Sequence, residues 1–271
     1  MEPLEVCYEA ETAAAVELPA SLRRLYGGGL ALADRLVYAN FVSTLDGIVA
    51  IPSMPGSNKL IAAGSEADRF VMGLLRAVAD VVLIGAGTLS GSPRGDWTPA
   101  QAFPPAGEEF ARLRRQLGLS AEPALAIVSG RGSLSPAHPA LEREPVVLTS
   151  DGGAARLRGR LPRGCTIVGL GEDAVLDPRR VVEALRRRGH HRILVEAGPN
   201  GFGGLVAAGV VDELFLTISP LLAGRADGSG RLGLVEAADL VPHRVETRLL
   251  GLRRHDAHLF LRYGLSARGV R

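Results

Sequence analysis

Short apolar segments alternate with amphipathic ones along most of the chain, and this alternation constrains the fold more than any other feature. The apolar segments are rich in Val, Ile, Leu or Ala and end near Gly, Ser or Thr, as strands buried on both faces do. The predicted strands are 37–42, 81–84, 124–128, 146–149, 166–168 and 193–195. Amphipathic segments between them predict helices, so the chain is expected to form an α/β fold with a mostly parallel sheet.

The predicted helices begin with recognisable start signals. Ser65 and Asp68 form an S-x-x-D capping box ahead of apolar residues at helical spacing. A helix over 178–188 begins after Asp177 with Pro178 in its first turn, where proline is favoured. Two further helices are predicted at 108–117 and 203–208.

The pattern changes toward the C-terminus. Segments 213–219, 246–253 and 258–263 are predicted strands, and the short polar link between the last two indicates a C-terminal antiparallel hairpin. A Gly-rich loop is predicted at 222–231.

The N-terminal residues differ from the rest of the chain. Residues 1–34 combine several Glu residues, an Ala-rich stretch and the flexible triple glycine at 27–29, and are predicted to be an N-terminal extension. Residues 35–271 are predicted to form one domain.

Composition excludes several functional classes. The 31 Lys and Arg residues balance 29 Asp and Glu residues to a net charge of +2, so a nucleic-acid-binding face is not expected. The acidic N-terminus is not a signal peptide, and no apolar run reaches the roughly 18 residues of a membrane span. The two cysteines have no metal-binding spacing. We therefore expect a cytoplasmic protein that acts on a small molecule, without nucleic acid, membrane or metal.

Polar residues follow the first predicted strand. Asn40, Thr44 and Asp46 lie at or near its end, and Asp46-Gly47 is a turn pair. Ligands of open α/β sheets bind outside the carboxyl ends of strands, which makes these residues candidates for a binding site. A plain turn explains them equally well.

Glycines follow two other strands. Gly85, Gly87 and Thr88 come after 81–84, where glycine allows a phosphate or a nicotinamide amide to approach the backbone closely. The segment lacks the full G-x-G-x-x-G fingerprint, so a standard dinucleotide-binding fold is not supported. Gly169 follows the strand at 166–168 and could border the same binding crevice as Gly85 and Gly87, or it could form a tight turn.

An acidic residue follows the strand at 193–195. Glu196 comes directly after this apolar run, where a carboxylate is costly unless it is paired or used. The next segment, Gly198-Pro199-Asn200-Gly201, opens a short helix, and its backbone N–H groups could cradle an anion. A structural role for Glu196 as an acceptor of backbone donors remains open.

The order of these motifs resembles the RibD C-terminal reductase family. The segments in question are N-F-V-S-T-L-D-G, G-S-E-A-D-R-F, L-L-R-A-V-A-D-V-V-L-I-G-A-G-T, I-L-V-E-A-G-P-N-G and V-D-E-L-F-L-T-I-S-P-L-L-A-G. The resemblance covers about residues 36–263. It implies a three-layer α/β/α dihydrofolate reductase-like fold, a homodimer, and an NADPH-dependent oxidoreductase of riboflavin biosynthesis.

The resemblance also implies roles for individual residues. The substrate would be a ribosylaminopyrimidine 5′-phosphate, reduced at C1′ of its ribosyl group. Glu196 and Asp46 would be catalytic, and Asn40, Thr44 and Arg94 would bind substrate. The residues implied to bind NADPH are Gly85, Gly87, Thr88, Gly169, Gly198, Pro199, Asn200 and Gly201.

One segment departs from the family pattern. Family members commonly continue after the position of Thr88 with an Arg-Ala-Asp-Asn-Pro type sequence, whereas this chain has Leu89-Ser-Gly-Ser-Pro-Arg-Gly-Asp96. Arg94 or Asp96 could replace the missing contact, Arg94 as a phosphate clamp, or both could be loop charges. Two alternatives therefore stay open: a reductase of a different heterocycle, and a catalytically inactive nucleotide-binding homologue.

Overall fold

The computed structural model describes residues 1–10, 16–242 and 245–267. A ten-stranded sheet organises these residues, in the order β1-β11-β12-β9-β2-β8-β4-β5-β6-β7, and β10 pairs with β3 in a small second sheet. The strands are β1 Glu5–Glu9, β2 Leu36–Ser43, β3 Ile48–Ala50, β4 Val81–Gly85, β5 Ala124–Val128, β6 Val146–Thr149, β7 Thr166–Gly169, β8 Arg192–Val195, β9 Glu213–Ile218, β10 Leu232–Gly233, β11 Val245–His255 and β12 His258–Ala267.

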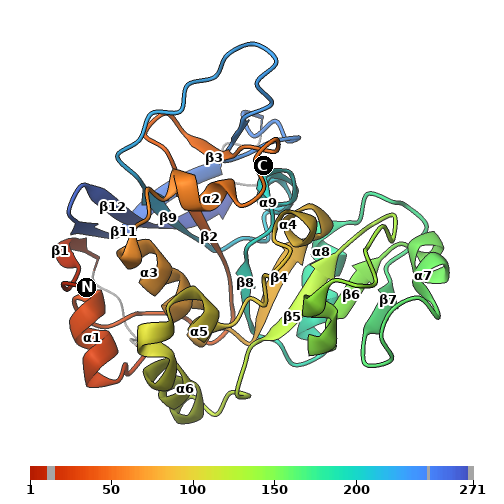
Figure 1. Cartoon of the computed structure of the whole chain (residues 1–271), viewed down its shortest axis with the longest axis horizontal. Coiled ribbons are helices and arrows are strands. Elements are labelled where there is room, and N and C mark those ends of the chain that lie inside the picture. The colour runs from red at the N-terminus through yellow and green to blue at the C-terminus, as the bar shows by residue number, and fades with distance from the viewer. Residues whose placement is uncertain (11–15, 243–244, 268–271) are drawn as a thin grey trace.

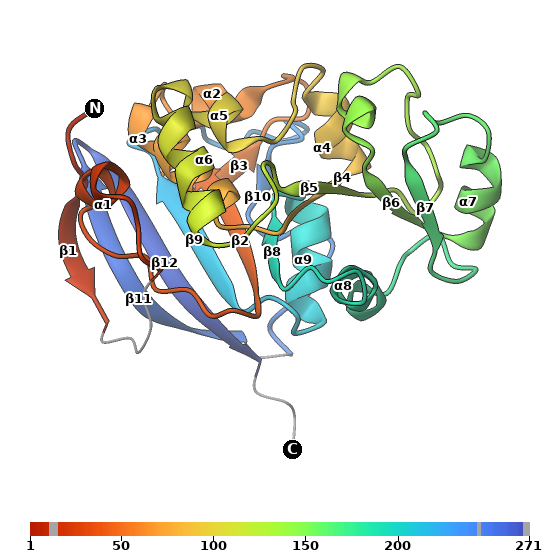
Figure 2. The ribbon, with the colours of Figure 1, turned by 90° about the horizontal axis from the view of Figure 1, so that it is seen from below.

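Helices cover both faces of this sheet. They are α1 Ala20–Tyr26, α2 Ser57–Ile61, α3 Glu66–Ala77, α4 Ala86–Gly91, α5 Pro99–Ala102, α6 Gly107–Gln116, α7 Asp151–Leu157, α8 Pro178–Arg186 and α9 Pro199–Ala207, with 3-10 turns at Pro104–Ala106 and Pro139–Arg143. Figure 2 shows α3, α5 and α6 on one face and α8 and α9 on the other. Two separate apolar clusters fill the two interfaces, which confirms the predicted three-layer α/β/α architecture.

The seven strands from β9 to β7 run parallel, so their carboxyl ends share one edge of the sheet. After β4 the chain moves outward through β5 and β6 to β7, and then returns to insert β8 between β2 and β4. Such a reversal of strand order creates a crevice in which ligands of open α/β sheets bind.

The predicted C-terminal hairpin is confirmed. β11 and β12 pair antiparallel, and β12 pairs antiparallel with β9. The N-terminal residues extend this part of the molecule, because β1 adds to the edge of β11 (Figure 1). Leu4, Leu22 and Tyr26 are buried in the same apolar cluster as α3. The Ala-rich part of the predicted extension, 11–15, lies outside the described residues.

Several element boundaries differ from the sequence predictions. The helix predicted at 203–208 begins at Pro199, because proline fits the first helical position even though the following glycines have low helix propensity. The strand-end glycines at 85–88 are also partly helical, since α4 begins at Ala86. Both glycine-rich segments are thus the starts of helices rather than open loops. The strands β1, β3 and β10 and the helices α1, α2, α4, α5 and α7 were not predicted.

No helix among the described residues is both long enough and apolar enough to cross a membrane. The described part of the chain also contains no cluster of three or more His, Cys, Asp or Glu side chains that could hold a metal ion.

Candidate active site

Polar side chains gather at the carboxyl ends of three neighbouring strands. Glu196 follows β8, Asn40 lies on β2 and Thr217 lies on β9. The residues two positions earlier, Leu194, Tyr38 and Phe215, are buried in the apolar cluster that includes α3. Because side chains alternate along a strand, residues two positions apart point to the same side of the sheet. All three therefore lie on the side of the sheet that α3 covers.

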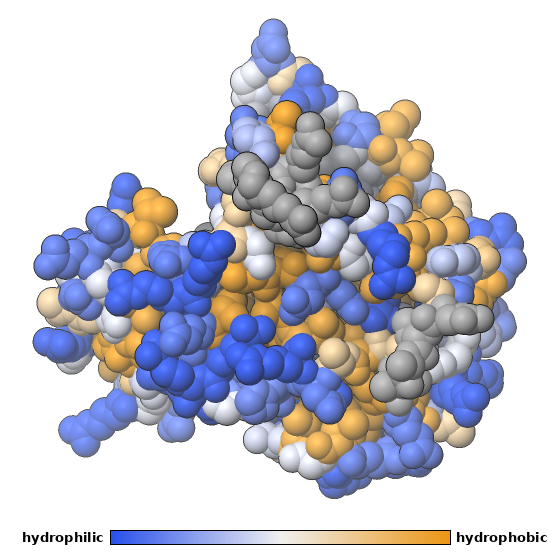
Figure 3. Space-filling model, turned by 180° about the vertical axis from the view of Figure 1, so that it is seen from behind, coloured by the Kyte–Doolittle hydropathy of each residue, from blue (hydrophilic) through white to orange (hydrophobic). Residues whose placement is uncertain are grey.

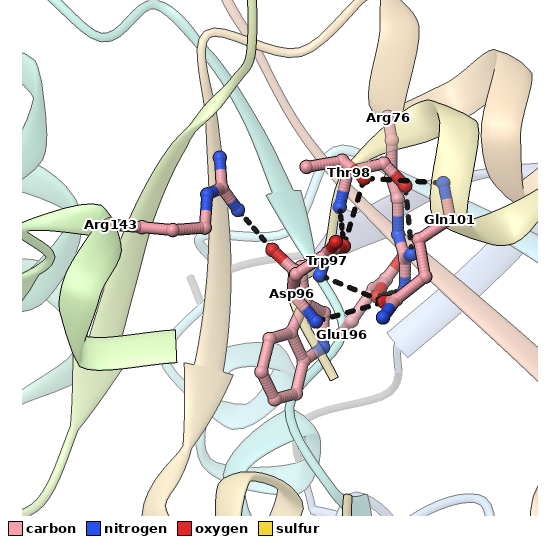
Figure 4. Close-up of polar contacts among 7 residues, drawn as sticks. All are labelled: Arg76, Asp96, Trp97, Thr98, Gln101, Arg143 and Glu196. Atoms are coloured by element: carbon pink, nitrogen blue, oxygen red, sulfur yellow. Dashed lines mark hydrogen bonds and ion pairs between the residues drawn. The ribbon is translucent and has the colours of Figure 1, made fainter. Parts of the chain in front are cut away.

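Glu196 forms a buried ion pair with Arg76 of α3. The guanidinium donates from Nε to Oε1 at 3.0 Å and from Nη2 to Oε2 at 2.7 Å, a two-point contact that occupies both carboxylate oxygens. The side chains are only 8% and 10% exposed, for Arg76 and Glu196 respectively. Figure 4 shows the two groups directed at each other. This arrangement belongs to the carboxylate form of Glu196.

The same arginine fastens the segment that departs from the family pattern. Arg76 Nη1 donates to the carbonyl oxygen of Thr98 at 3.2 Å. The backbone N–H and the hydroxyl of Thr98 both donate to Asp96 Oδ1 at 2.8 Å. Gln101 completes the turn. Its amide oxygen accepts from the Asp96 N–H (Figure 4), and its amide nitrogen donates to the Arg94 carbonyl. Asp96 is therefore used to shape the turn, whereas Arg94 is exposed.

A second buried carboxyl group, that of Asp68, lies in the first turn of α3. Ser65 caps the helix as predicted, since its hydroxyl accepts from the Asp68 N–H at 3.1 Å. The other half of the predicted capping box does not form, because the Ser65 N–H donates to the Ala62 carbonyl instead. Asp68 is 4% exposed, and Thr217 hydrogen-bonds its carboxyl group. Burial is the largest influence on this group and raises its pKa to about 6.

The glycine-rich segments after β4 and β8 lie beside each other. A β-carbon built on Gly198 would be 3.8 Å from Thr88 Oγ1, which places the starts of α4 and α9 next to one another. β-Carbons built on Gly85 or Gly87 would have no atom within 4 Å. Backbone at these two glycines thus borders open space in which a ligand could approach it closely.

The first turn of α9 adds backbone donors to this region. Pro199 occupies the first helical position, and the N–H groups of Asn200 and Gly201 precede the first intrahelical hydrogen bond, which Phe202 donates to Gly198. Helix starts of this kind favour anions. Pro199 is buried and Asn200 is exposed.

Asp46 and Thr44 lie in the turn after β2, where their side chains hold the turn together. The Thr44 hydroxyl donates to Asp46 Oδ1 at 2.5 Å and accepts from the Ile48 N–H at 3.0 Å. The Asp46 carboxylate also accepts from the N–H groups of Ala223 and Gly224, at 3.1 and 2.5 Å. These donors, with the Thr44 hydroxyl first, lower the pKa of Asp46 to about 2. The contacts fasten the loop after β9 to the turn, and the catalytic role of Asp46 stays a prediction.

The remaining predicted residues lie at different distances from Glu196 along the sheet. Asn40 is on β2, which pairs directly with β8. Gly169 ends β7, the far edge strand, with β4, β5 and β6 between it and β8. A β-carbon on Gly169 would meet Asp151 Oδ1 at 2.3 Å, so close packing against α7 already accounts for this glycine. Its role in cofactor binding stays a prediction.

Sequence reasoning missed Arg76 and Thr217 and noted Asp68 only as a helix cap. Arg76 lies 120 residues from its partner Glu196, and no local pattern shows such a pairing. One signal was present, because Asp68, Val71 and Leu75 share a helix face by their spacing and all three are buried. An acid in register with apolar residues on an amphipathic helix points to a buried, functional or paired group.

A surface hollow lies at the other end of the strands. It is lined by α8 side chains, including Arg179 and Arg186, together with Arg35 and Val210, which precede β2 and β9. Figure 3 shows the face on which α8 and α9 lie, where hydrophilic side chains border apolar surface. This hollow is at the amino ends of the strands and shares no residue with the Glu196 region.

Comparison with known proteins gives consistent matches. The family model described as the RibD C-terminal domain matches residues 35–256. The chain is 25% identical over 195 residues to the 2,5-diamino-6-ribosylamino-4(3H)-pyrimidinone 5′-phosphate reductase of Archaeoglobus fulgidus, an alignment that covers 70% of this chain and 83% of that protein.

Two solved structures share the fold. A pyrimidine reductase-like protein from Corynebacterium diphtheriae superposes with a TM-score of 0.69 at 21% identity, covering 91% of this chain and 98% of that one. Acinetobacter baumannii RibD gives a TM-score of 0.62 at 19% identity, covering 86% of this chain and 59% of that longer one.

Proposed function

The chain belongs to the RibD C-terminal domain family, and from this premise we propose that it is an NADPH-dependent reductase of a ribosylaminopyrimidine 5′-phosphate. The ribosyl group would be reduced to a ribityl group by hydride transfer to C1′. The name of the Archaeoglobus relative supports this substrate class. The observation that carries the proposal is the meeting of two glycine-rich helix starts, after β4 and β8, beside the buried carboxylate of Glu196.

The residues at these helix starts fit a dinucleotide phosphate. Gly85 and Gly87 leave open space at the backbone, and Thr88 offers a hydroxyl beside Gly198. The first turn of α9 presents N–H groups to an anion, such as the diphosphate of the cofactor. The bound cofactor would supply the hydride.

Glu196 is suited to stabilise positive charge in the reaction. Opening of the ribosyl ring leaves an iminium carbon at C1′, and a fixed carboxylate beside that carbon lowers the energy of the developing cation. The two-point contact with Arg76 holds the carboxylate in place before substrate binds, so no reorganisation is needed during the reaction. Asn40 on β2, the neighbour of β8, and Thr217 on β9, the strand beyond β2, would contact the substrate from the same side.

The direct test is oxidation of NADPH. Purified protein is mixed with NADPH and the ribosylaminopyrimidine phosphate, and loss of reduced nicotinamide absorbance is followed together with formation of the ribityl product. We expect both to proceed in equal amounts. Failure to bind either NADPH or NADH would rule out a reductase, and binding of one without turnover would rule out this substrate.

A glycine substitution tests the cofactor site. We expect Gly87→Val to weaken NADPH binding by about tenfold or more, because its side chain would occupy the open space beside the backbone. Gly91→Val is the matched control, since Gly91 lies in the same helix and also has no neighbour within 4 Å of a built β-carbon. Titration of NADPH fluorescence measures both. Equal affinities in the two variants would remove Gly87 from the site.

One observation favours a related reductase with another substrate. Asp96, the acid of the departing segment, is engaged by Thr98 and Gln101 in shaping a turn, and Arg94 is exposed. The substrate contact expected from the family pattern would then come from Arg94 alone. A turnover screen with other phosphorylated and unphosphorylated heterocycles separates the two candidates. If the wild type requires a phosphate on its substrate and Arg94→Gln does not, the result supports the ribosylaminopyrimidine phosphate.

The assembly is proposed from the family resemblance. We infer a homodimer, and sedimentation analysis of the full chain would report a mass of twice 28.4 kDa.

A further inference from the structure

Asp68 is a buried carboxyl group that the helix cap does not use. The backbone N–H of Asp68 donates to the Ser65 hydroxyl at 3.1 Å. The Asp68 side chain does not accept from the Ser65 N–H in return, because that N–H donates to the Ala62 carbonyl at 3.0 Å. The carboxyl group instead meets Thr217 of β9. Because Glu66 already places a negative charge in this first turn, the dipole of α3 does not require Asp68 to be buried.

The surroundings of Asp68 favour its protonated form. Burial raises the pKa of the carboxyl group to about 6, the hydrogen bond from Thr217 lowers it, and the negative charge of Glu196 raises it. Arg69, on the same helix, lowers the pKa by its positive charge, but its side chain is 50% exposed beside Glu66. Arg76 is already engaged by Glu196. A carboxyl group whose pKa is raised to about 6 is protonated below that pH and can then donate a proton.

The two buried carboxyl groups therefore have different properties. Both oxygens of Glu196 accept from a guanidinium, so Glu196 serves as a fixed anion. Asp68 is buried beside an anionic neighbour, and burial above all raises its pKa, against the opposing effect of the Thr217 hydrogen bond, so Asp68 holds a proton more readily. Two carboxyl groups in one site can have different pKa values because their environments differ. One can then act as an acid while the other stays an anion.

We propose that Asp68 stores the proton that the reduction consumes and delivers it to the substrate through the hydroxyl of Thr217. Asp68 is then a positioning residue, because it acts through Thr217 rather than on the substrate itself. A hydroxyl can accept from the Asp68 carboxyl group and donate its own proton onward. This inference rests on the proposed reductase function.

The proton step balances with the reduction. As the C1′–O4′ bond of the ribosyl ring breaks, the amine nitrogen lone pair forms the C1′=N bond, and O4′ takes the Thr217 hydroxyl proton. Thr217 is restored by the Asp68 proton, which leaves Asp68 ionised until it recovers a proton from water. C1′ would then accept the hydride that a bound reduced cofactor supplies, and the electron pair of the C1′=N bond would return to nitrogen. One proton and one hydride are consumed, as the net reaction requires.

Kinetics at varied pH test the relay. In the wild-type enzyme, kcat should fall as pH rises through about 6, because the donor loses its proton there. Asp68→Asn should lose about 10²-fold or more in kcat and no longer show this decline. The matched control is Glu66→Gln, which alters the exposed acid of the same helix turn and should keep the wild-type profile. A wild-type profile in Asp68→Asn would overturn the proposal.

Substitutions at Thr217 separate the relay from a structural tie between α3 and β9. Thr217→Val keeps the shape of the side chain but removes the hydroxyl, and should reduce kcat about as much as Asp68→Asn. Thr217→Ser restores the hydroxyl and should recover most of the wild-type kcat. Equal kcat in the Val variant and the wild type would overturn the relay, and so would a Ser variant as slow as the Val variant.

A measurement without substrate distinguishes failure of the relay from failure of the proposed function. The folded-state pKa of about 6 lies above the ordinary value of 3.8, so folding takes up a proton between these values and stability falls as pH rises from about 4 to above 6. Asp68→Asn should lose this part of the pH dependence in denaturant unfolding. Parallel curves for the two proteins would overturn proton storage by Asp68. The expected difference in a protein that never oxidises NADPH would overturn the reductase assignment instead.

Discussion

Glu196 and Asp46 have similar sequence contexts but different structural environments. Each carboxylate follows an apolar strand of the parallel sheet, at the same edge, and each was a candidate catalytic residue. Glu196 is 10% exposed at its side chain and is paired to a guanidinium from a distant helix. Asp46 is exposed and accepts from a neighbouring hydroxyl and two backbone N–H groups. The position after a strand thus identifies a candidate, and the partners of the carboxylate indicate its role.

The difference is one of desolvation. Water screens the Asp46 carboxylate, so its hydrogen bonds organise a turn and a loop but contribute little to the free energy of unfolding. Water hardly reaches Glu196 and Arg76, so the charge of each must be compensated by the other. A site that fixes an unscreened charge is suited to catalysis, because electrostatic interactions are strong there.

The largest effect is expected from removal of the cation. Arg76→Met leaves the Glu196 carboxylate buried without its partner, and we expect a loss of about 3–5 kcal/mol in the free energy of unfolding. Denaturant unfolding measures it. The double variant Arg76→Met, Glu196→Gln removes both charges and should recover most of this loss. If the double variant is as unstable as the single one, the charge is not the cause, and the contrast with Asp46 loses its basis.

A smaller but more specific effect is expected at the acid. Glu196→Gln keeps the shape and a hydrogen-bonding oxygen but removes the negative charge, so kcat should fall about 10²-fold while NADPH affinity changes little. This corresponds to about 2.7 kcal/mol of transition-state stabilisation. Steady-state turnover and NADPH titration on the same preparation provide both values. Comparable losses in the two would refute a catalytic role for Glu196.

Much of the fold could be predicted from the sequence because it depends on local signals. The strands at 124–128 and 146–149 match β5 and β6 at both ends, and the C-terminal hairpin follows from two apolar segments with a polar link. β1 could not be predicted, because all five of its residues are exposed and carry no burial pattern. α4 was not predicted and the start of α9 was placed too late, because glycine has low helix propensity, whereas ligand-binding helices often begin with glycine.

The candidate site was predictable only in part. The glycines and Glu196 can be recognised in the sequence because they follow predicted strands. Their chemistry depends on α3, which the sequence predicted only as an amphipathic helix with a cap. Arg76 and Asp68 contact strands that lie far along the chain, and the pairing of a helix with particular strand ends depends on the whole topology. Local spacing can show that Asp68 lies on the buried face of its helix, but it does not show which strand that face contacts.

The smallest effect is expected at Asp46, where it would complete the comparison. Asp46→Asn removes the carboxylate that accepts from Ala223 and Gly224, so these two backbone N–H groups should exchange hydrogen faster while kcat falls less than about threefold. The low folded-state pKa of about 2, against 3.8, means that this stabilisation is present above about pH 4 and is lost as pH falls toward 2. The wild type and the variant should therefore differ most near neutral pH and converge in acid. Unchanged exchange at Ala223 and Gly224 together with a large loss of kcat would instead place Asp46 beside Glu196 as a catalytic residue.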